Sequence, residues 1–234
     1  MGLRREHVRR AVRTIPMRLL GLAVLSLTAC GGSRAVTSTG APAIENRETS
    51  VALPPLYAQL FVESEKEFPA EKIVSHQGEH GPETEKESGT ITCTVSGVRA
   101  IQGGKVAELA CGGSPSLPSS PSGTYVGTAT GLWRIDGGDV GDDIARLDPK
   151  QMLVAAKPTK QRRETKDPDG DVDSGSAIIV EPHAGGWCVL VTSWGGDEGG
   201  WQLCLREAAG VIGGHGFFAG GETHDVYFGD VRRI

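Results

Sequence analysis

Residues 187–206 read WCVLVTSWGGDEGGWQLCLR, and their pattern is the clearest indication of the fold in the sequence. Two β-rich runs, residues 187–194 and 201–206, flank glycines and acidic residues, which is the composition of a turn. A turn near Gly196 places Cys188 opposite Cys204. The same register sets Trp187, Val189 and Val191 across from Leu205, Leu203 and Trp201. We therefore predict an antiparallel hairpin with one apolar face in a core.

A second hairpin follows from residues 90–98 and 105–111. A turn centred on Gln102, within Gln102, Gly103 and Gly104, places Cys93 opposite Cys111. Opposite residues of antiparallel strands have Cα atoms about 4.5 to 5.5 Å apart, which suits a disulfide. Each disulfide closes a loop of roughly 15 to 20 residues and contributes about 3 kcal/mol.

Four of the five cysteines therefore have a local partner, and we predict disulfides Cys93–Cys111 and Cys188–Cys204. Four cysteines allow three connectivities, and the hairpin registers select this one. A zinc site is the alternative use of four cysteines, but no Cys-x-x-Cys pair is present. An oxidising compartment is the setting in which such disulfides form.

Further β segments separated by turn signals indicate a single all-β antiparallel domain of about eight to ten strands, with 34 glycines in the chain. The sheet is expected to be curved, as a sandwich or barrel, and its closure stays open. We expect residues 53–62 to form the first strand or the edge of the domain, residues 63–88 a solvated strand and long loop, and residues 157–173 a charged loop.

The N-terminus carries six arginines before a short apolar stretch, residues 19–27, which is typical of an export signal. The stretch has about nine residues, whereas roughly 20 are needed to cross a bilayer as a helix. Leu27, Thr28, Ala29 and Cys30 resemble the lipobox of bacterial lipoproteins, which implies cleavage before Cys30 and lipid on that cysteine. Alternatives are an ordinary cleavage site with an incidental cysteine, or a signal-anchor helix.

This interpretation divides the chain into a signal peptide (residues 1–29), a lipidated cysteine with a disordered tether (30–52) and the β domain (53–234). Removing the signal takes away six of 24 basic and one of 29 acidic residues, so the net charge becomes −10. That charge argues against nucleic acid as a partner. Gly31, in place of aspartate, favours the outer membrane of a diderm cell envelope.

The chain also resembles bacterial envelope lipoproteins in which a short tether precedes a meandering β domain with two cysteine hairpins. The residues that carry this resemblance are 53–61, 90–111, 123–133 and 187–218. The resemblance supports the fold and the location, and it implies no activity.

Two histidine motifs are weak candidates for metal chemistry. Residues 76–80, HQGEH, match the H-x-x-E-H pattern of zinc peptidases, but Gly78 interrupts the helix which that motif needs. In the last two β segments, a turn near Gly220 brings His215 and His224 close to facing each other. We interpret residues 76–80 as a solvated loop, and His215 and His224 as surface or strand-edge histidines.

The carboxylates Asp167, Asp169, Asp171 and Asp173 alternate around Gly170, as in calcium loops, but the full EF-hand pattern is absent. We therefore expect no cofactor beyond weak calcium binding.

No G-x-S-x-G motif or phosphate loop is present. We expect a non-enzymatic binding or structural module, held to the membrane by N-terminal lipid, whose partner is an envelope protein or a small apolar ligand. The alternatives are a metal-dependent enzyme or calcium-stabilised domain, and a lipid or lipoprotein carrier with a half-open barrel.

Overall fold

The computed structural model describes residues 51–79, 81–135, 144, 147–166 and 174–231. The chain divides into two compact units, Met1–Glu45 and Asn46–Ile234, and all described residues belong to the second. Within the described ranges, no helix is both long and apolar enough to span a membrane.

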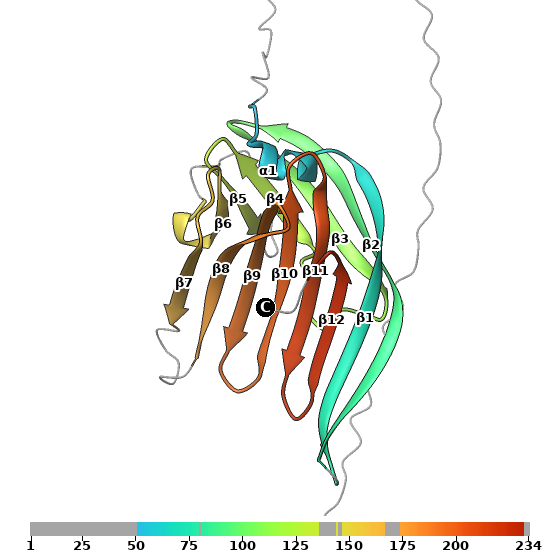
Figure 1. Cartoon of the computed structure of the whole chain (residues 1–234). Coiled ribbons are helices and arrows are strands. Elements are labelled where there is room, and N and C mark those ends of the chain that lie inside the picture. Colours follow the sequence, from blue (N-terminus) through green and yellow to red (C-terminus); the bar gives the residue numbers. More distant parts are fainter. Residues whose placement is uncertain (1–50, 80, 136–143, 145–146, 167–173, 232–234) are drawn as a thin grey trace, which may run out of the picture. The chain divides into compact units, whose positions relative to one another are not determined.

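The second unit is one curled antiparallel sheet that forms a half-barrel (Figure 1). It contains twelve strands, two more than the upper limit of the sequence prediction. The strands are β1 Ser64–Gly78, β2 Gly81–Ile101, β3 Gly104–Ser114, β4 Gly123–Thr128, β5 Gly131–Ile135, β6 Met152–Ala155, β7 Gln161–Lys166, β8 Gly175–His183, β9 Gly186–Trp194, β10 Glu198–Arg206, β11 Gly210–Ala219 and β12 Thr223–Gly229.

The extra strands come from segments that the sequence analysis assigned largely to loops. The charged residues 63–88 form β1 and the first part of β2, and β7 lies within the expected loop 157–173. Strand patterns rest on an alternation of apolar and polar residues, and all of β7 except Gln161 and Arg163 is exposed. An exposed edge strand therefore gives no apolar signal in the sequence.

The topology consists of two six-stranded meanders joined by the first and last strands. Strands β1 to β6 pair successively, strands β7 to β12 do the same, and β1 pairs with β12 from Ala70↔Phe228 to Ser75↔Thr223. This order leaves β6 and β7 as the two edges of the sheet.

The registers of both cysteine hairpins agree with the prediction. In the β9–β10 hairpin, Cys188 pairs with Cys204, and their Cα atoms are 4.0 Å apart. In the β2–β3 hairpin, Cys93 pairs with Cys111 at 4.1 Å. The two disulfides are therefore present as predicted.

A β-bulge sets the register of Cys93. The turn between β2 and β3 holds Gln102 and Gly103, because Ile101 pairs with Gly104. Continued without interruption, that register would set Cys93 against Gly112. The register shifts by one residue between Ser96 and Arg99, which brings Cys93 to Cys111.

The expected first strand is wrong, because residues within 53–62 form helical turns. The helix α1 spans Pro55–Ala58, and the 3₁₀ turn η1 spans Gln59–Phe61. Pro55 at the first helical position has the φ angle that a helix needs. The buried residues of these turns are Leu56, Tyr57, Leu60 and Phe61. Leu56 and Leu60 are four residues apart, as are Tyr57 and Phe61, and this spacing places the side chains on one face of the helical segment.

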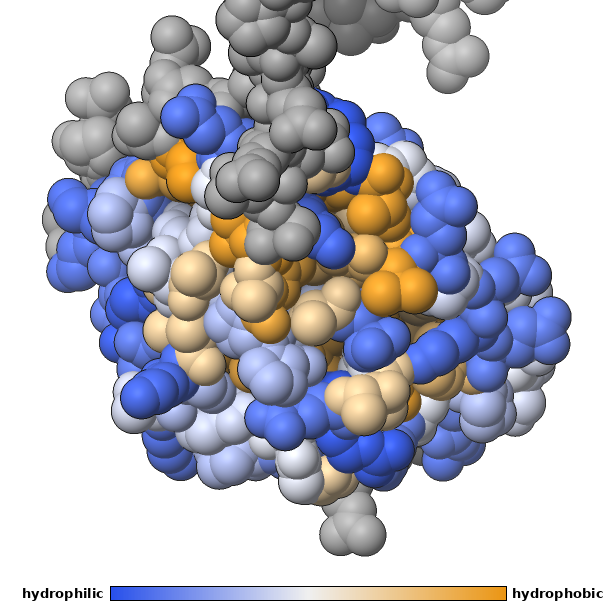
Figure 2. Space-filling model, turned by 90° about the horizontal axis from the view of Figure 1, so that it is seen from above, coloured by the Kyte–Doolittle hydropathy of each residue, from blue (hydrophilic) through white to orange (hydrophobic). Residues whose placement is uncertain are grey.

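This helical segment covers one end of the half-barrel (Figure 1). Phe61 packs so closely on β4 that a Cβ atom at Gly127 would lie 2.4 Å from its ring. Seen from this end, hydrophobic side chains gather near the centre and hydrophilic ones surround them (Figure 2). The segment therefore completes the core where the sheet alone leaves it open.

The main core lies on the inner face of the curled sheet, with α1 and η1 packed against it. Successive side chains of a strand point to opposite faces of the sheet, and the two disulfides lie on different faces. Cys93 and Cys111 belong to the inner core, whereas Cys188 and Cys204 form a small outer cluster with Ile212. Trp133 belongs to another cluster, formed by β2 to β5 and Ile144.

Candidate ligand-binding site

The inner face of the half-barrel forms a cavity of about 450 Å³ that is open to solvent on one side. Its walls come from both halves of the sheet: Arg134 of β5, Leu153 of β6, Ile178 of β8, Val191 of β9 and Trp201 of β10. A further hollow of about 310 Å³ shares Ser176, Val191 and Trp201 with it. Volumes of roughly 300 to 1,000 Å³ are typical of small-molecule sites.

Trp201 lines both hollows, as do Ser176 and Val191, and it is the one aromatic residue that they share. Its two neighbours across the sheet are Val191 of β9 and Gly216 of β11. A Cβ atom at Gly216 would lie 2.0 Å from the carbonyl oxygen of Ser119, so only glycine permits that close approach. The loop that carries Ser119 thus packs on β11 at Gly216, and Ser119 lines the smaller hollow together with Trp201.

Arg134 places a cation inside the half-barrel. Its Cζ atom lies 4.8 Å from the centroid of the Trp201 ring, within the range of a cation–π interaction. The alternation of β5 explains this position: Leu132 belongs to the inner core and Trp133 to the outer cluster, so Arg134 turns inward again. Arg134 thereby joins β5 to β10 across the interior.

The lining of the cavity combines apolar walls with a few polar groups. Leu153, Ile178 and Val191 supply aliphatic surface, while Gln151 and Ser176 supply an amide and a hydroxyl. The neighbouring hollow adds Asp197 and the half-exposed Phe218. Such a lining suits a small amphipathic molecule, with its apolar part against the aliphatic wall and its polar part near Arg134.

Arg163 of β7 bridges the two edges of the sheet beside this cavity. Its guanidinium donates hydrogen bonds to the carbonyl oxygens of Met152 and Leu153 in β6, and to those of Pro149 and Lys150 in the 3₁₀ turn η3, Pro149–Gln151. Burial lowers the pKa of Arg163 from its ordinary value. A charged side chain thus connects edges that no backbone ladder joins in the described part of the chain.

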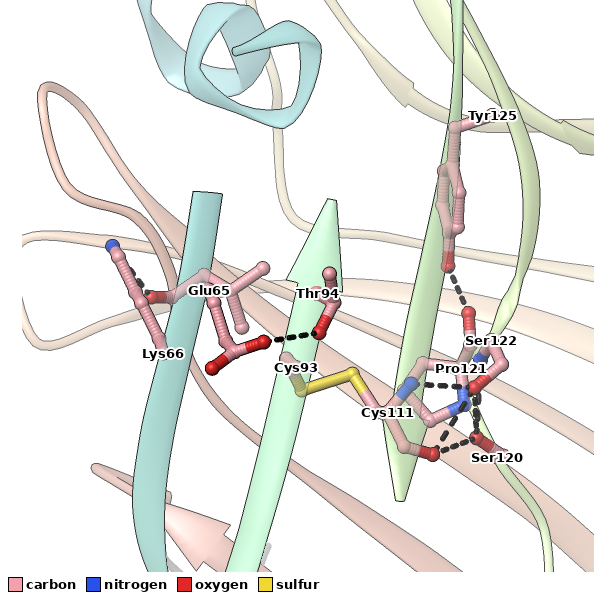
Figure 3. Close-up of a disulfide and its surroundings, with 10 residues drawn as sticks. Glu65, Lys66, Cys93, Thr94, Cys111, Ser120, Pro121, Ser122 and Tyr125 are labelled. Atoms are coloured by element: carbon pink, nitrogen blue, oxygen red, sulfur yellow. Dashed lines mark hydrogen bonds between the residues drawn. A yellow bond between two sulfur atoms is a disulfide. The ribbon is translucent and has the colours of Figure 1, made fainter. Parts of the chain in front are cut away.

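The loop after β3 is hydrogen-bonded to the backbone of Cys111, which belongs to the inner disulfide (Figure 3). The backbone N–H of Cys111 donates to Ser122 Oγ at 2.8 Å, and the Ser120 and Ser122 hydroxyls donate to the Cys111 carbonyl. The Tyr125 hydroxyl donates to the Pro121 carbonyl at 2.6 Å. This network holds the segment that brings Ser119 to the 310 Å³ hollow.

The structure separates the two histidines of the last hairpin, so their expected approach is wrong. His215 pairs with Tyr227, while His224 pairs with Phe218. The turn is centred on Gly221 and not on Gly220, so His224 opposes a residue three positions from His215, and this odd separation places the two side chains on opposite faces.

His215 instead contacts an acid and a neighbouring ring. Its Nε2 lies 2.8 Å from Asp225 Oδ1, and its ring stacks on Tyr227 with centroids 4.1 Å apart. These contacts tie β11 to β12 on the outer face.

Of the two other candidate metal motifs, only residues 76–79 lie within the described ranges. His76 lies 3.4 Å from Glu83 across the β1–β2 ladder, and strand pairing rather than a helix surrounds it. Cys30, His80 and the carboxylates Asp167, Asp169, Asp171 and Asp173 lie outside the described residues. Within the described ranges, no group of three metal-ligating side chains is present.

Comparison with family models, with curated proteins and with solved structures finds no match for this chain. The site therefore has to be interpreted from its own geometry.

Sequence reasoning missed most of this cavity. It placed Trp201 on a core face, but it gave no role to Arg134 or Arg163. The one available signal for Arg134 was a charged residue between Trp133 and Ile135 in a β-rich run. Nothing in the sequence pointed to Arg163, because the carbonyl oxygens that it contacts in β6 come near it only when the sheet curls.

Proposed function

We propose that this protein is a non-enzymatic, lipid-anchored cell-envelope protein whose half-barrel binds a small amphipathic ligand. The observation that carries the ligand-binding part is the inner cavity of about 450 Å³, where Arg134 of β5 lies over the ring of Trp201 of β10 and aliphatic side chains of β6, β8 and β9 complete the lining.

The chemistry of the lining supports binding more than catalysis. The cavity offers a cation, a hydroxyl and an amide beside apolar walls, which can orient a ligand. A nucleophile needs a base within hydrogen-bond reach to activate it. Ser176 is the only hydroxyl that lines the 450 Å³ cavity in the described residues, and no histidine lines that cavity there.

Membrane attachment is the second part of the proposal, and the sequence around Cys30 supports it. Lipid on Cys30 would place the β domain after a tether of about twenty residues, outside the inner membrane. The two disulfides agree with an oxidising location. Gly31 favours the outer membrane if the organism is diderm.

Native mass spectrometry of the protein purified from membranes tests the ligand-binding part. We expect a small molecule to co-purify with the native chain and to be lost from Val191→Trp, because the larger ring fills the inner cavity. Leu190→Trp is the matched control: Leu190 is adjacent in β9 but faces the outer side, where it lines a different groove.

The co-purified molecule should persist in the Leu190→Trp variant. Absence of any bound molecule from the native chain, together with no binding in a screen of amphipathic compounds, would contradict the proposal. Retention of the molecule by Val191→Trp would place it elsewhere on the protein.

A further inference from the structure

A second concavity lies on the outer face of strands β7 to β10, separate from the inner cavity. Its volume is about 480 Å³, and its lining includes Lys160, Arg162, Ile179, Leu190 and Gln202. It shares no lining residue with the 450 Å³ inner cavity. The sheet separates the two, since Ile178 lines the inner cavity and Ile179 lines this outer groove.

Strand register places four of these residues in one row across the sheet. Arg162 pairs with Ile179, Ile179 with Leu190, and Leu190 with Gln202. Adjacent strands are about 4.8 Å apart, so the row extends over roughly 14 Å. It begins with a cation, continues with two aliphatic side chains and ends with an amide.

Gln202 is the unusual member of the row. The residue is only 3% exposed, and its Nε2 atom has no hydrogen-bond partner in the structure. A buried polar group without a partner destabilises the folded state by about 1 to 3 kcal/mol. The side chain lines the groove, so rotation of its amide can present an N–H to an acceptor bound there.

The charges at the rim favour an anionic acceptor. Lys160 and Arg162 carry positive charge, and Glu181 is the one acidic residue of the lining within the described ranges. Lys160 pairs with Glu181 at 3.0 Å and Arg162 with Glu164 at 2.6 Å, but both cations are more than half exposed. Exposed ion pairs are weak and exchange readily. The lining thus carries two cations and one acid, a net charge of +1, on an acidic protein.

We propose that this outer groove is a binding site for a small amphipathic carboxylate. The apolar part of the ligand lies on Ile179 and Leu190. Its carboxylate accepts a hydrogen bond from the Gln202 amide and is attracted by Lys160 and Arg162. The site does not depend on the inner cavity or on lipidation of Cys30.

Methyl NMR of the oxidised full chain carrying Cys30→Ser tests the proposal, with sodium decanoate as the probe. We expect a saturable shift of the Ile179 methyl signals and no shift at Ile178, because these neighbours face opposite sides of the sheet. Decanol, which has the same chain length without the charge, should bind at least fivefold more weakly.

Two pairs of variants sharpen the assignment. Gln202→Leu keeps the size and removes the donor, and it should weaken decanoate binding about tenfold. Leu190→Trp should abolish the binding, whereas Val191→Trp on the inner face should leave it within twofold of the native value. The wild-type Ile179 and Ile178 shifts remain decisive if a variant does not fold.

Any of three results would overturn the proposal. These are no saturable shift at Ile179, a shift confined to Ile178, and decanol binding as tight as that of decanoate. The first result removes the site, the second moves the ligand to the inner cavity, and the third removes the carboxylate as the recognised group. The first and third results do not bear on whether another ligand occupies the inner cavity.

Discussion

Arg163 on one edge strand of the sheet donates a hydrogen bond to the carbonyl oxygen of Leu153 on the other edge, with an Nη2–O distance of 3.3 Å. The same guanidinium also reaches the carbonyl of Met152. Edge strands present unpaired backbone groups that can recruit another chain. Here one side chain satisfies carbonyls of β6 and keeps the two edges of the half-barrel together beside the inner cavity.

Replacement of Arg163 should therefore loosen the contact between the edges. Arg163→Ala removes charge-assisted hydrogen bonds to several carbonyls, and we expect the free energy of unfolding to fall by about 2 kcal/mol. Arg163→Lys keeps the charge but loses the planar donor geometry, so its loss should be intermediate. Urea denaturation measures both.

Arg162→Ala is the matched control for this prediction. Arg162 is adjacent in β7, and its ion pair with Glu164 is exposed. Its loss should change stability by less than about 1 kcal/mol. An equal effect of the Arg162 and Arg163 variants would contradict a specific role of Arg163 between the edges.

The two disulfides should each stabilise the domain by a similar amount. They close loops with sequence separations of 18 and 16 residues. Replacing either cysteine pair with alanines should lower the free energy of unfolding by about 3 kcal/mol. The two losses should add in the fourfold variant, because the pairs lie on different hairpins and different faces. Denaturation of all three variants measures this, and losses below 1 kcal/mol would refute it.

Tyr57 should make stability depend on pH in the alkaline range. Its side chain is fully buried and donates a hydrogen bond to the Thr128 carbonyl at 2.8 Å. Burial raises the pKa of Tyr57 above its ordinary value. The unfolded chain therefore releases the Tyr57 proton at a lower pH than the folded chain does. The stability linked to Tyr57 is full below about pH 10 and declines above it.

Tyr57→Phe isolates this effect. At neutral pH the variant should be about 1 kcal/mol less stable, because it lacks the hydrogen bond. Above about pH 10 the native protein should lose up to about 1.4 kcal/mol per pH unit relative to the variant. Urea midpoints of both proteins between pH 7 and 11 measure the difference. A difference that stays constant over this range would exclude Tyr57 as the cause.

Cys30→Ser tests the proposed anchor. The substitution removes the only side chain that the lipobox resemblance assigns to lipid, so membrane retention and incorporation of labelled fatty acid should both be lost. Both disulfides should still form, which non-reducing electrophoresis can verify. Unchanged fractionation with the membrane would argue against lipidation at this residue.

The sequence predicted those parts of the fold in which local pattern and long-range pairing agree. The hairpin around Gly196 is one example, because apolar alternation and the cysteine spacing give the same register. The register of the last hairpin was less secure. His215 and His224 lie on either side of Gly220 and Gly221, and glycine-rich turns allow neighbouring registers.

The helical segment before β1 had a signal that strand-based reasoning overlooked. Leu56, Tyr57, Leu60 and Phe61 have helical spacing after a proline pair, but a run of ten residues is also compatible with a strand. The helical conformation is favoured over a strand because it lets these side chains fill the open end of the half-barrel. A surface of that shape exists only after the sheet has curled.

By itself, the sequence determined the all-β class, both disulfide pairs and the apolar face of the β9–β10 hairpin, because each depends on residues close together in the chain. The tertiary structure decided the twelve-stranded order, the stacking of Arg134 on Trp201 and the bridging of the edges by Arg163. The physical reason is the curvature of the sheet: β5 and β10 meet across the interior only when the sheet curls, and no local pattern encodes how far it does so.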